Sequence, residues 1–354
     1  MISIDLSAEQ RARAYDLPTT KGRIRQRTAD FRVDECLGFE ASGDGEHVLL
    51  QVEKSGCNTL DVVNILAAHA GSTRRDVGYS GLKDKHAVCT QWFTVRCVSG
   101  VDWGALERPG VRILKADRHR RKLRRGSHRA NRFLIRAGID RLDRADLDTR
   151  LEHIRSGGVP NYFGEQRFGR RYAENADRLL AGRPLARSQR SLTLSAVRAD
   201  LFNRVLDRRV RDRNWNVALP GEYVNLDGSR SGFPVLGGDP DIAPRIVSLD
   251  LHPTAPLYGA GPNPASGEVA SMEAEVLGGH QALCELLVHQ GLRMERRPTR
   301  IAVRDLQWRV DETGRTLELG FVLGRGQYAT SVLREVLDYE DVTRTGHPEE
   351  PAPP

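Results

Sequence analysis

The chain has 354 residues, of which 39% are hydrophobic and 29% charged, and its formal net charge is +7. This length permits a sizeable core, arranged as one large domain or two smaller ones. No stretch approaches the roughly 20 apolar residues of a membrane span, and residues 1–5 lack the basic-then-apolar layout of a signal peptide. We therefore expect a cytoplasmic protein with no membrane partner.

Cysteine and histidine spacing predicts neither a disulfide framework nor a metal site. The five cysteines include no C-x-x-C pair. His280, Cys284 and His289 lie near one another, but their spacing does not place all three on one face of a helix. Reduced thiols and no bound metal are the expectation.

Residues 20–157 read as alternating strands and helices. Short segments rich in β-branched and aromatic residues predict strands at 46–53, 91–97, 111–116 and 132–137. Residues 58–70 form a helical pattern that Asn58 or Thr59 caps and Gly71 ends. A second helix is expected over about 141–154, before Gly157, Gly158 and Pro160.

The pattern changes after residue 158. Long helical patterns follow, notably 192–213, together with two stretches dense in Gly and Pro, 228–240 and 253–267, which we expect to be loops. Strand character returns at 316–323, and a short helix is expected over 329–337. These patterns predict a mixed α/β domain made of residues 1–157 and 300–345, a second domain inserted at 158–299, and a disordered tail at 346–354.

Positive charge is concentrated in residues 115–136, which we call the basic stripe. It holds ten Lys or Arg side chains and one acid, Asp117, a local charge of +9. Such polarisation suits a polyanion, because each neutralised phosphate releases condensed counterions. A merely solvated face explains a charge run about as well.

Asp84 lies in a turn region between Lys83 and Lys85, shortly before a predicted strand. An Asp after a turn glycine such as Gly81 is more often a turn or cap residue. Alternatively, Lys83, Lys85 and His86 favour its ionised form, and a positioned carboxylate can act as nucleophile or base.

Four segments resemble those of the TruD family of pseudouridine synthases. The family's active-site motif is matched by GLKDKHA at 81–87, and the signature that opens its inserted domain by VPNYFGEQRFG at 159–169. The segments SLTLSAVRADLFN at 191–203 and ATSVLRE at 329–335 are similar to further family segments. The resemblance runs in blocks from about residue 20 to 335, with little recognisable between about 210 and 295.

The resemblance implies a pseudouridine synthase catalytic domain, with a mixed, mainly antiparallel sheet, and an inserted α/β TRUD domain. It implies that Asp84 is the catalytic carboxylate and that Phe31, Asn131, Tyr328 and Lys83 bind the substrate. Phe31 and Tyr328 offer stacking to a uridine that has left its helix, and Asn131 offers a donor and an acceptor to the uracil edge. Each aromatic could instead be a core residue, and Tyr328 stands where the family commonly has Phe.

The implied reaction isomerises uridine to pseudouridine in tRNA, at position thirteen of the D-arm and notably in glutamate tRNA. No electrons or groups are exchanged with a second substrate, so no cofactor is expected. We expect a monomer whose Lys122, Arg124 and Arg125 contact the RNA backbone. Whether Asp84 attacks C1′, adds to C6 or abstracts a ribose proton stays open.

Two alternatives come from other classes of protein. A non-catalytic RNA-binding protein would use the basic stripe and would not need Asp84. A glycosidase-type hydrolase would pair Asp84 with a second carboxylate such as Glu35 and release free uracil or sugar. The sequence lacks G-x-G-x-x-G, a P-loop and H-E-x-x-H, so nothing supports a nucleotide cofactor or a zincin.

Overall fold

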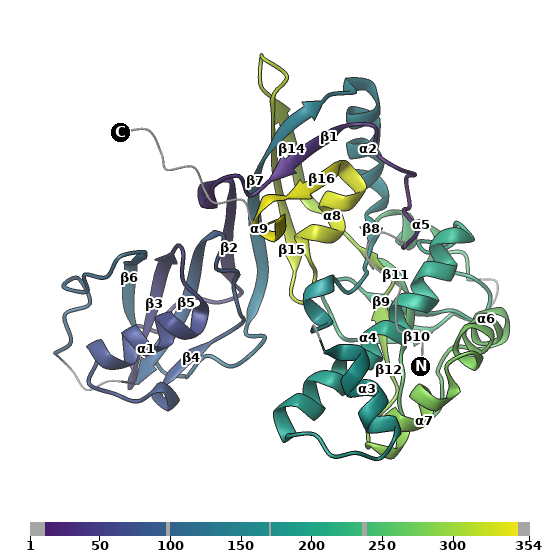
Figure 1. Ribbon diagram of the computed structural model, residues 1–354, viewed down its shortest axis with the longest axis horizontal. Coiled ribbons are helices and arrows are strands. Elements are labelled where there is room, and N and C mark those ends of the chain that lie inside the picture. Colours follow the sequence, from purple (N-terminus) through teal and green to yellow (C-terminus); the bar gives the residue numbers. More distant parts are fainter. Residues whose placement is uncertain (1–10, 97–99, 170, 236–238, 346–354) are drawn as a thin grey trace. The chain divides into compact units, whose positions relative to one another are not determined.

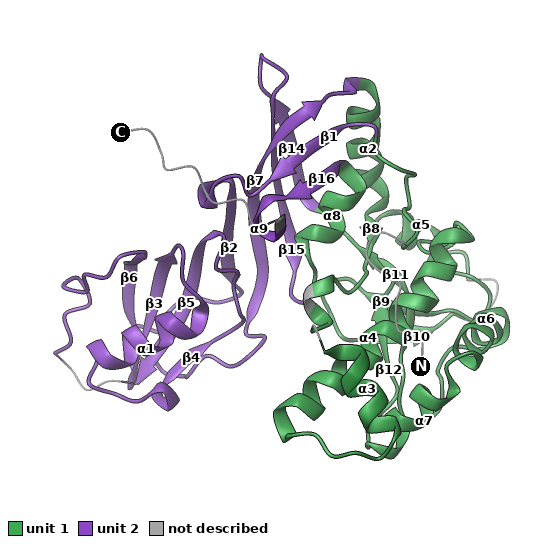
Figure 2. Cartoon of the chain, in the orientation of Figure 1, with its two compact units in different colours: residues 1–18, 145–303, 327–336 green, residues 19–144, 304–326, 337–354 purple. Residues whose placement is uncertain are grey.

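The structure is a computed structural model that describes residues 11–96, 100–169, 171–235 and 239–345. The chain divides into two compact units (Figure 2). Unit 1 comprises residues 1–18, 145–303 and 327–336, and unit 2 comprises 19–144, 304–326 and 337–354. None of the helices in the described ranges is long and apolar enough to cross a membrane. The predicted tail at 346–354 lies outside the described residues.

Unit 2 is built on a sheet of ten strands within the described residues. Seven of them run in the order β14-β15-β7-β2-β5-β3-β6, while β1 pairs with β7 and β16, and β4 with β5. The pairs β1–β16 and β2–β5 are parallel, and the other described pairs in this sheet are antiparallel. The predicted mixed, mainly antiparallel sheet is therefore confirmed. The strands are β1 Lys21–Ile24, β2 Phe31–Leu37, β3 His47–Lys54, β4 Val77–Tyr79, β5 Val88–Arg96, β6 Val111–His119, β7 His128–Arg141, β14 Arg304–Val310, β15 Thr316–Gly324 and β16 Asp338–Asp341.

Helix α1 (Thr59–His69) packs against this sheet beside β3 and β5 (Figure 1). The Asp61 carboxylate accepts a 2.8 Å hydrogen bond from the backbone N–H of Asn58, which closes the first turn. Gly71 adopts φ +60° just after the helix, a conformation that glycine tolerates best. The buried face of α1, including Val62 and Leu66, packs with Leu50 and other strand residues. The short elements η1 Thr28–Asp30, η2 Arg74–Asp76 and α9 Val342–Thr345 complete unit 2.

Unit 1 is centred on the long helix α4, whose apolar face lies in a large hydrophobic cluster with α3, α7 and the segment after β8. A four-stranded antiparallel sheet, β10-β9-β11-β12 in the described residues, packs with it, and β8 pairs with β13. The elements are α2 Arg144–Gly157, β8 Val159–Pro160, η3 Glu165–Arg167, α3 Tyr172–Leu180, α4 Arg187–Arg211, β9 Tyr223–Leu226, β10 Gly232–Pro234, α5 Ile242–Val247, β11 Leu251–Leu257, α6 Gly267–Gly278, α7 Gln281–His289, β12 Glu295–Pro298, β13 Arg300–Ile301 and α8 Ala329–Val336.

Both stretches predicted to be loops contain a strand, because 228–240 includes β10 and 253–267 begins with most of strand β11. Pro253 and Pro256 misled the sequence interpretation, since proline lacks the N–H that a central strand uses. In the structure Leu251–Pro253 pair with β9, whereas Thr254–Leu257 pair with β12. Each proline therefore lies where β11 has a single partner strand.

The two compact units do not coincide with the predicted domains 1–157 plus 300–345 and 158–299. Residues 1–18, 145–157, 300–303 and 327–336 group with unit 1. Arg150 of α2 accounts for much of this grouping, because its buried guanidinium donates to the backbone oxygens of Tyr15, Leu17 and Glu335. These bonds tie α2 to the N-terminal segment and to α8.

Candidate active site

Asp84 lies in the loop before β5, with a side chain 29% exposed. Its Oδ2 atom is 3.0 Å from Nη2 of Arg25, and its Oδ1 atom accepts a 3.0 Å hydrogen bond from the backbone N–H of His86. The backbone oxygen of Asp84 accepts a 2.6 Å hydrogen bond from the ammonium of Lys54, which is buried. Side chain and backbone are thus both fixed, and part of the carboxylate still faces solvent.

Arg25 is the cation that contacts this carboxylate, and sequence reasoning missed it. Its side chain is 5% exposed and its second terminal nitrogen, Nη1, lies 2.5 Å from Oδ2 of Asp341. The guanidinium lies 4.3 Å from the ring centroid of Phe31. Arg25 follows β1 with φ +58°, which turns its side chain away from the strand's regular alternation. The sequence does not single out Arg25 among the many arginines of the chain. Neither its left-handed backbone conformation nor a contact with a residue 59 positions away produces a local sequence pattern.

Lys83 does not contact the Asp84 carboxylate as its position in the sequence suggested. Its Nζ atom lies 2.5 Å from Oε2 of Glu35, whose carboxylate is fully buried. Glu35 also accepts a hydrogen bond from the backbone N–H of Trp92 at 3.3 Å. Burial raises the pKa of Glu35, and the ammonium of Lys83 opposes that rise. Lys83 therefore anchors the Asp84 loop to β2.

Hydrogen bonds within unit 2 hold the rest of this loop. Thr59 accepts a 2.9 Å bond from the backbone N–H of Lys83, and Gln91 donates a 2.7 Å bond to the backbone oxygen of Gly81. His128, at the start of β7, is close enough to Lys83 that this ammonium, after burial, lowers the pKa of His128 to about 4. The loop that carries Asp84 is thus tied to α1 and β5.

Asn131 is buried on β7, opposite Glu35 of β2 and Leu323 of β15. Its side-chain oxygen has no hydrogen-bond partner among the described residues. A buried amide oxygen without a partner is uncommon, because desolvating it without a hydrogen bond is unfavourable. Asn131 therefore has an acceptor, or a donor if the amide is turned over, that a ligand could use.

Phe31 and Tyr328 have different surroundings. Phe31 is 3% exposed, with Arg25 over its ring and Phe133 in an edge contact at 6.3 Å between centroids. Tyr328 lies in unit 1, partly buried against the core that contains Phe163. Within unit 2 the structure therefore brings together Asp84, Phe31 and Lys83 through Arg25 and Glu35, and Tyr328 belongs to the other unit.

The three proposed backbone cations lie in the loop 120–127 of unit 2. The ammonium of Lys122 donates to the backbone oxygen of Arg75. Arg125 lies 4.1 Å from the ring centroid of Tyr79 and donates to its hydroxyl. The exposed side chain of Arg124 has no hydrogen-bond or ion-pair partner among the described residues. None of the three makes an ion pair with a carboxylate among the described residues.

The motif at 159–169 is built into unit 1. The backbone N–H of Phe163 donates to Asn203 of α4 at 2.8 Å, and Arg11 donates to the backbone oxygen of Phe163 at 2.7 Å. Arg297 lies 4.1 Å from the centroid of the Phe163 ring and donates to Asn161 at 2.6 Å. These contacts give the motif a structural role in the core of unit 1.

Comparison with known proteins decides the family. The family model described as "tRNA pseudouridine synthase D (TruD)" matches residues 8–176 and 170–336. The chain belongs to this family. It is 44% identical to the tRNA pseudouridine synthase D of Methylococcus capsulatus, over 93% of this chain and 94% of the relative. It is 41% identical to the protein of the same name from Pseudomonas syringae pv. tomato, over 95% of this chain and 97% of the relative. The Nitrosococcus oceani protein of the same name is 43% identical over 93% and 95%.

A solved structure shares the fold. The putative tRNA pseudouridine synthase D of Methanosarcina mazei superposes with a TM-score of 0.72, covering 92% of this chain and 95% of that one at 20% identity. The match to the family model and to these relatives confirms the family resemblance drawn from the motifs at 81–87 and 159–169. The chain is an enzyme of the isomerase class, a pseudouridine synthase of the TruD family.

Proposed function

We propose that this enzyme converts a uridine of tRNA to pseudouridine with Asp84 as its catalytic carboxylate. The observation that carries the proposal is the contact between Asp84 and the buried guanidinium of Arg25 at 3.0 Å. The reaction breaks the bond between N1 and C1′, rotates the uracil and rejoins it through C5. A fixed, negatively charged group next to C1′ or C6 serves each of the three possible roles of Asp84.

Arg25 and the N–H of His86 hold the two oxygens of Asp84 in one orientation. Preorganised charges need no rearrangement when the reaction begins, which lowers the barrier. Phe31 contributes by supporting Arg25, because its ring lies under the guanidinium. Any stacking of the substrate on Phe31 must use the part of the ring that Arg25 and Phe133 leave uncovered.

Asn131 is proposed to read the uracil edge. Its side-chain oxygen has no partner among the described residues and can accept a hydrogen bond from N3–H of uracil. A base without a donor at this position would leave the buried oxygen unbonded, which disfavours its binding. Tyr328 is proposed to stack on the extruded base, and Lys83 to act through Glu35 on the Asp84 loop rather than on the substrate directly. The backbone of the RNA is assigned to Lys122, Arg124 and Arg125.

The substrate is proposed to be tRNA, because the relatives that share this chain's full length are named tRNA pseudouridine synthases. Within it the target is the uridine at position thirteen of the D-arm, notably in glutamate tRNA. The protein is proposed to act without a cofactor, as a monomer, with residues 158–299 forming most of a separate TRUD domain. None of these finer assignments changes the role proposed for Asp84.

The rival roles of Asp84 make different predictions. A hydrolase that pairs Asp84 with Glu35 is disfavoured, because the Glu35 carboxylate is fully buried and bound by Lys83. Such a group cannot activate water on the far side of a sugar. A non-catalytic RNA-binding protein is also disfavoured. RNA binding alone does not require a partly exposed carboxylate that a buried arginine holds in place.

The proposal is tested by tritium release from uracil C5 in transcribed glutamate tRNA. Wild type should release one tritium per tRNA and form pseudouridine at position thirteen, located by carbodiimide modification and primer extension. Asp84→Asn should bind the same tRNA but release no tritium. Asp140→Asn, which alters an exposed ion pair with Arg23, is the control and should keep full turnover. Normal turnover by Asp84→Asn would refute the role of Asp84, and free uracil would indicate hydrolysis.

A further inference from the structure

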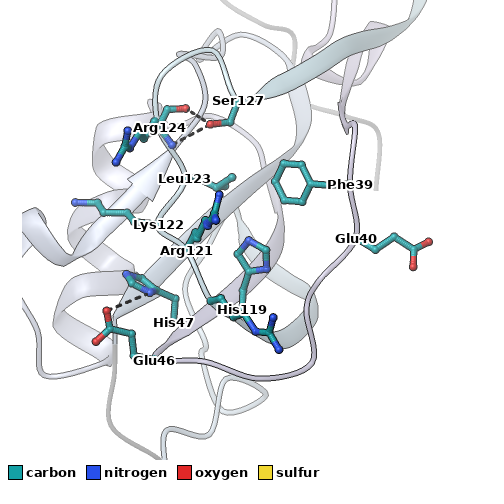
Figure 3. Close-up of a pocket in the computed structure, with 11 residues that line it drawn as sticks. Phe39, Glu40, Glu46, His47, His119, Arg121, Lys122, Leu123, Arg124 and Ser127 are labelled. Carbon is teal, nitrogen blue, oxygen red and sulfur yellow. Dashed lines mark hydrogen bonds and ion pairs between the residues drawn. The ribbon is translucent and has the colours of Figure 1, made fainter.

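A cavity of about 780 Å³ lies in unit 2, lined by residues of two loops and the strands beside them (Figure 3). The loop 38–46 connects β2 to β3, and the loop 120–127 connects β6 to β7. Residues His47 and His119 face each other across the β3–β6 pair and form the base of the cavity. The volume suits a nucleotide-sized ligand.

The two loops are locked together, so that the cavity is preformed. Asp44 accepts two hydrogen bonds from the guanidinium of Arg120, at 2.6 and 2.7 Å. The Ser42 hydroxyl accepts a 2.9 Å bond from the backbone N–H of Arg120. Gly45 adopts φ +107°, and a Cβ atom there would lie 2.5 Å from Cα of Arg120. The loops approach so closely that only glycine fits at this position.

An aromatic ring stands at the edge of this cavity. Phe39 is 41% exposed, and one face of its ring stacks on His119 at 5.5 Å between centroids and 15° between planes. The Nδ1 atom of His119 accepts a 3.3 Å hydrogen bond from the backbone N–H of Ser42, which fixes the imidazole. Burial, followed by the charge of Arg121, lowers the pKa of His119, which favours the neutral imidazole. A rigid ring with one open face is a platform for a base.

Two cations of the cavity have no internal partner. The side chains of Arg121 and Arg124 make no hydrogen bond or ion pair within the described residues. The acids in the lining do not neutralise them, because the Glu46 carboxylate contacts Arg96 at 3.0 Å and that of Glu40 points away from the cavity (Figure 3). Unpartnered guanidinium groups and an aromatic ring that line one cavity match the phosphate and the base of RNA.

We propose that this cavity binds an unpaired nucleotide of the RNA substrate, with the base stacked on Phe39 and the phosphate held by Arg121 and Arg124. The site is distinct from the one that holds the isomerised uridine. His47 and Lys54 stand at opposite ends of β3, about 23 Å apart at 3.3 Å per residue, and Lys54 is the residue that contacts Asp84. One nucleotide cannot span both places, so the cavity recognises a second, distant feature of the RNA fold.

This inference rests on the proposed action on tRNA, and its test separates the two. Wild-type turnover on the tRNA transcript is measured first, because an absence of turnover would contradict the proposed function and would not test the cavity. Affinity for the same transcript is then measured for Phe39→Ala, Phe39→Leu and Phe39→Tyr. Removal of base stacking should weaken binding about tenfold in the Ala and Leu variants, while Tyr retains a π face and near wild-type affinity. Single-turnover rates measured at saturating enzyme separate this loss of affinity from any effect on the chemical step.

Two further measurements locate the nucleotide. Arg121→Ala should weaken binding and flatten the dependence of log Kd on log salt by roughly 0.7, whereas the exposed Arg141 outside the cavity should have no such effect when changed to Ala. Benzoylphenylalanine at position 39 should crosslink one tRNA nucleotide that is not the isomerised uridine. The proposal is overturned if Phe39→Leu binds tRNA as tightly as wild type, or if the crosslink falls on the isomerised uridine. A crosslink to a paired nucleotide would likewise overturn it.

Discussion

Arg25 and Asp341 form a buried ion pair, with Nη1 of Arg25 2.5 Å from Oδ2 of Asp341 and both side chains at most 6% exposed. The same guanidinium contacts Asp84, so two carboxylates share one cation. Asp341 lies beyond residue 336, where the family model ends. It is held in turn by the hydroxyl of Thr343, which donates to Oδ1 at 2.8 Å. Arg25 therefore presents one terminal nitrogen to Asp84 while the other is held by Asp341.

We expect Asp341→Asn to slow isomerisation about five- to tenfold while leaving tRNA affinity unchanged. The change replaces a charge-assisted hydrogen bond with a neutral one, which holds Arg25 less firmly. Single-turnover rates and Kd measure the two effects separately. Asp338→Asn on the same strand is the matched control, because Asp338 makes only an exposed ion pair with Lys21. Equal rates for the two variants would show that Asp341 does not influence isomerisation through Arg25.

Neutralising Lys122, Arg124 and Arg125 together should weaken tRNA binding and flatten its salt dependence. The slope should fall by roughly 0.7 for each phosphate of a single-stranded segment that the variant no longer neutralises. Arg124→Ala alone should flatten the salt dependence without lowering the stability of the protein. Arg125→Ala should also lower the stability, because it removes the cation–π interaction with the Tyr79 ring. Filter binding over a salt series and thermal unfolding distinguish these contributions. An unchanged slope in the triple variant would exclude these side chains from the RNA interface.

His128 should make unit 2 less stable in mild acid. Its pKa of about 4 in the folded state lies below its ordinary value of 6.5. Between these two values the unfolded chain binds a proton that the folded chain does not, so stability falls as pH drops from 6.5 towards 4. His128→Gln should reduce this dependence in urea unfolding followed at several pH values. His289→Gln at an exposed position is the control and should retain the wild-type slope.

Arg209→Met should destabilise unit 1 by about 3–5 kcal/mol, because it leaves the fully buried carboxylate of Glu222 without its main partner. The guanidinium and that carboxylate lie 2.8 Å apart, and neither side chain is exposed. Arg209 also donates to the backbone oxygens of Asn214 and Val217. The double change Arg209→Met and Glu222→Leu should recover part of this stability in urea unfolding. A double variant less stable than the single one would contradict this account.

Much of the fold follows from local sequence signals. The helix at 59–69 has a polar cap and a terminal glycine, and the strand at 316–324 carries an apolar residue at every second position, each of them buried. Strand β11 escaped notice because its two prolines suggested a loop, and only its divided pairing makes them acceptable. The grouping of α2 with the N-terminal segment was also missed, since it depends on long-range contacts of Arg150 and Tyr15 that leave no local pattern.

The site divides in the same way. Asp84 was proposed because its motif is contiguous, and the structure places it in the expected loop before a strand. Arg25 and Asp341 could not be predicted, because their contacts join residues 59 and 257 positions away from Asp84 and neither lies in a distinctive pattern. Lys83 was adjacent in sequence but turns to Glu35 instead. Adjacency along the chain does not say where a long, flexible side chain points.

The parallel pairing of β1 with β16 has a consequence for how the enzyme is made. Arg25 and Asp341 lie 316 residues apart, so this ion pair closes one of the longest loops in the chain. Such contacts form late, because the entropy of loop closure must be overcome first. During synthesis the arginine that orients Asp84 lacks its second carboxylate until residue 341 has left the ribosome. A nascent chain can therefore fold its central strands before the buried ion pair between Arg25 and Asp341 forms.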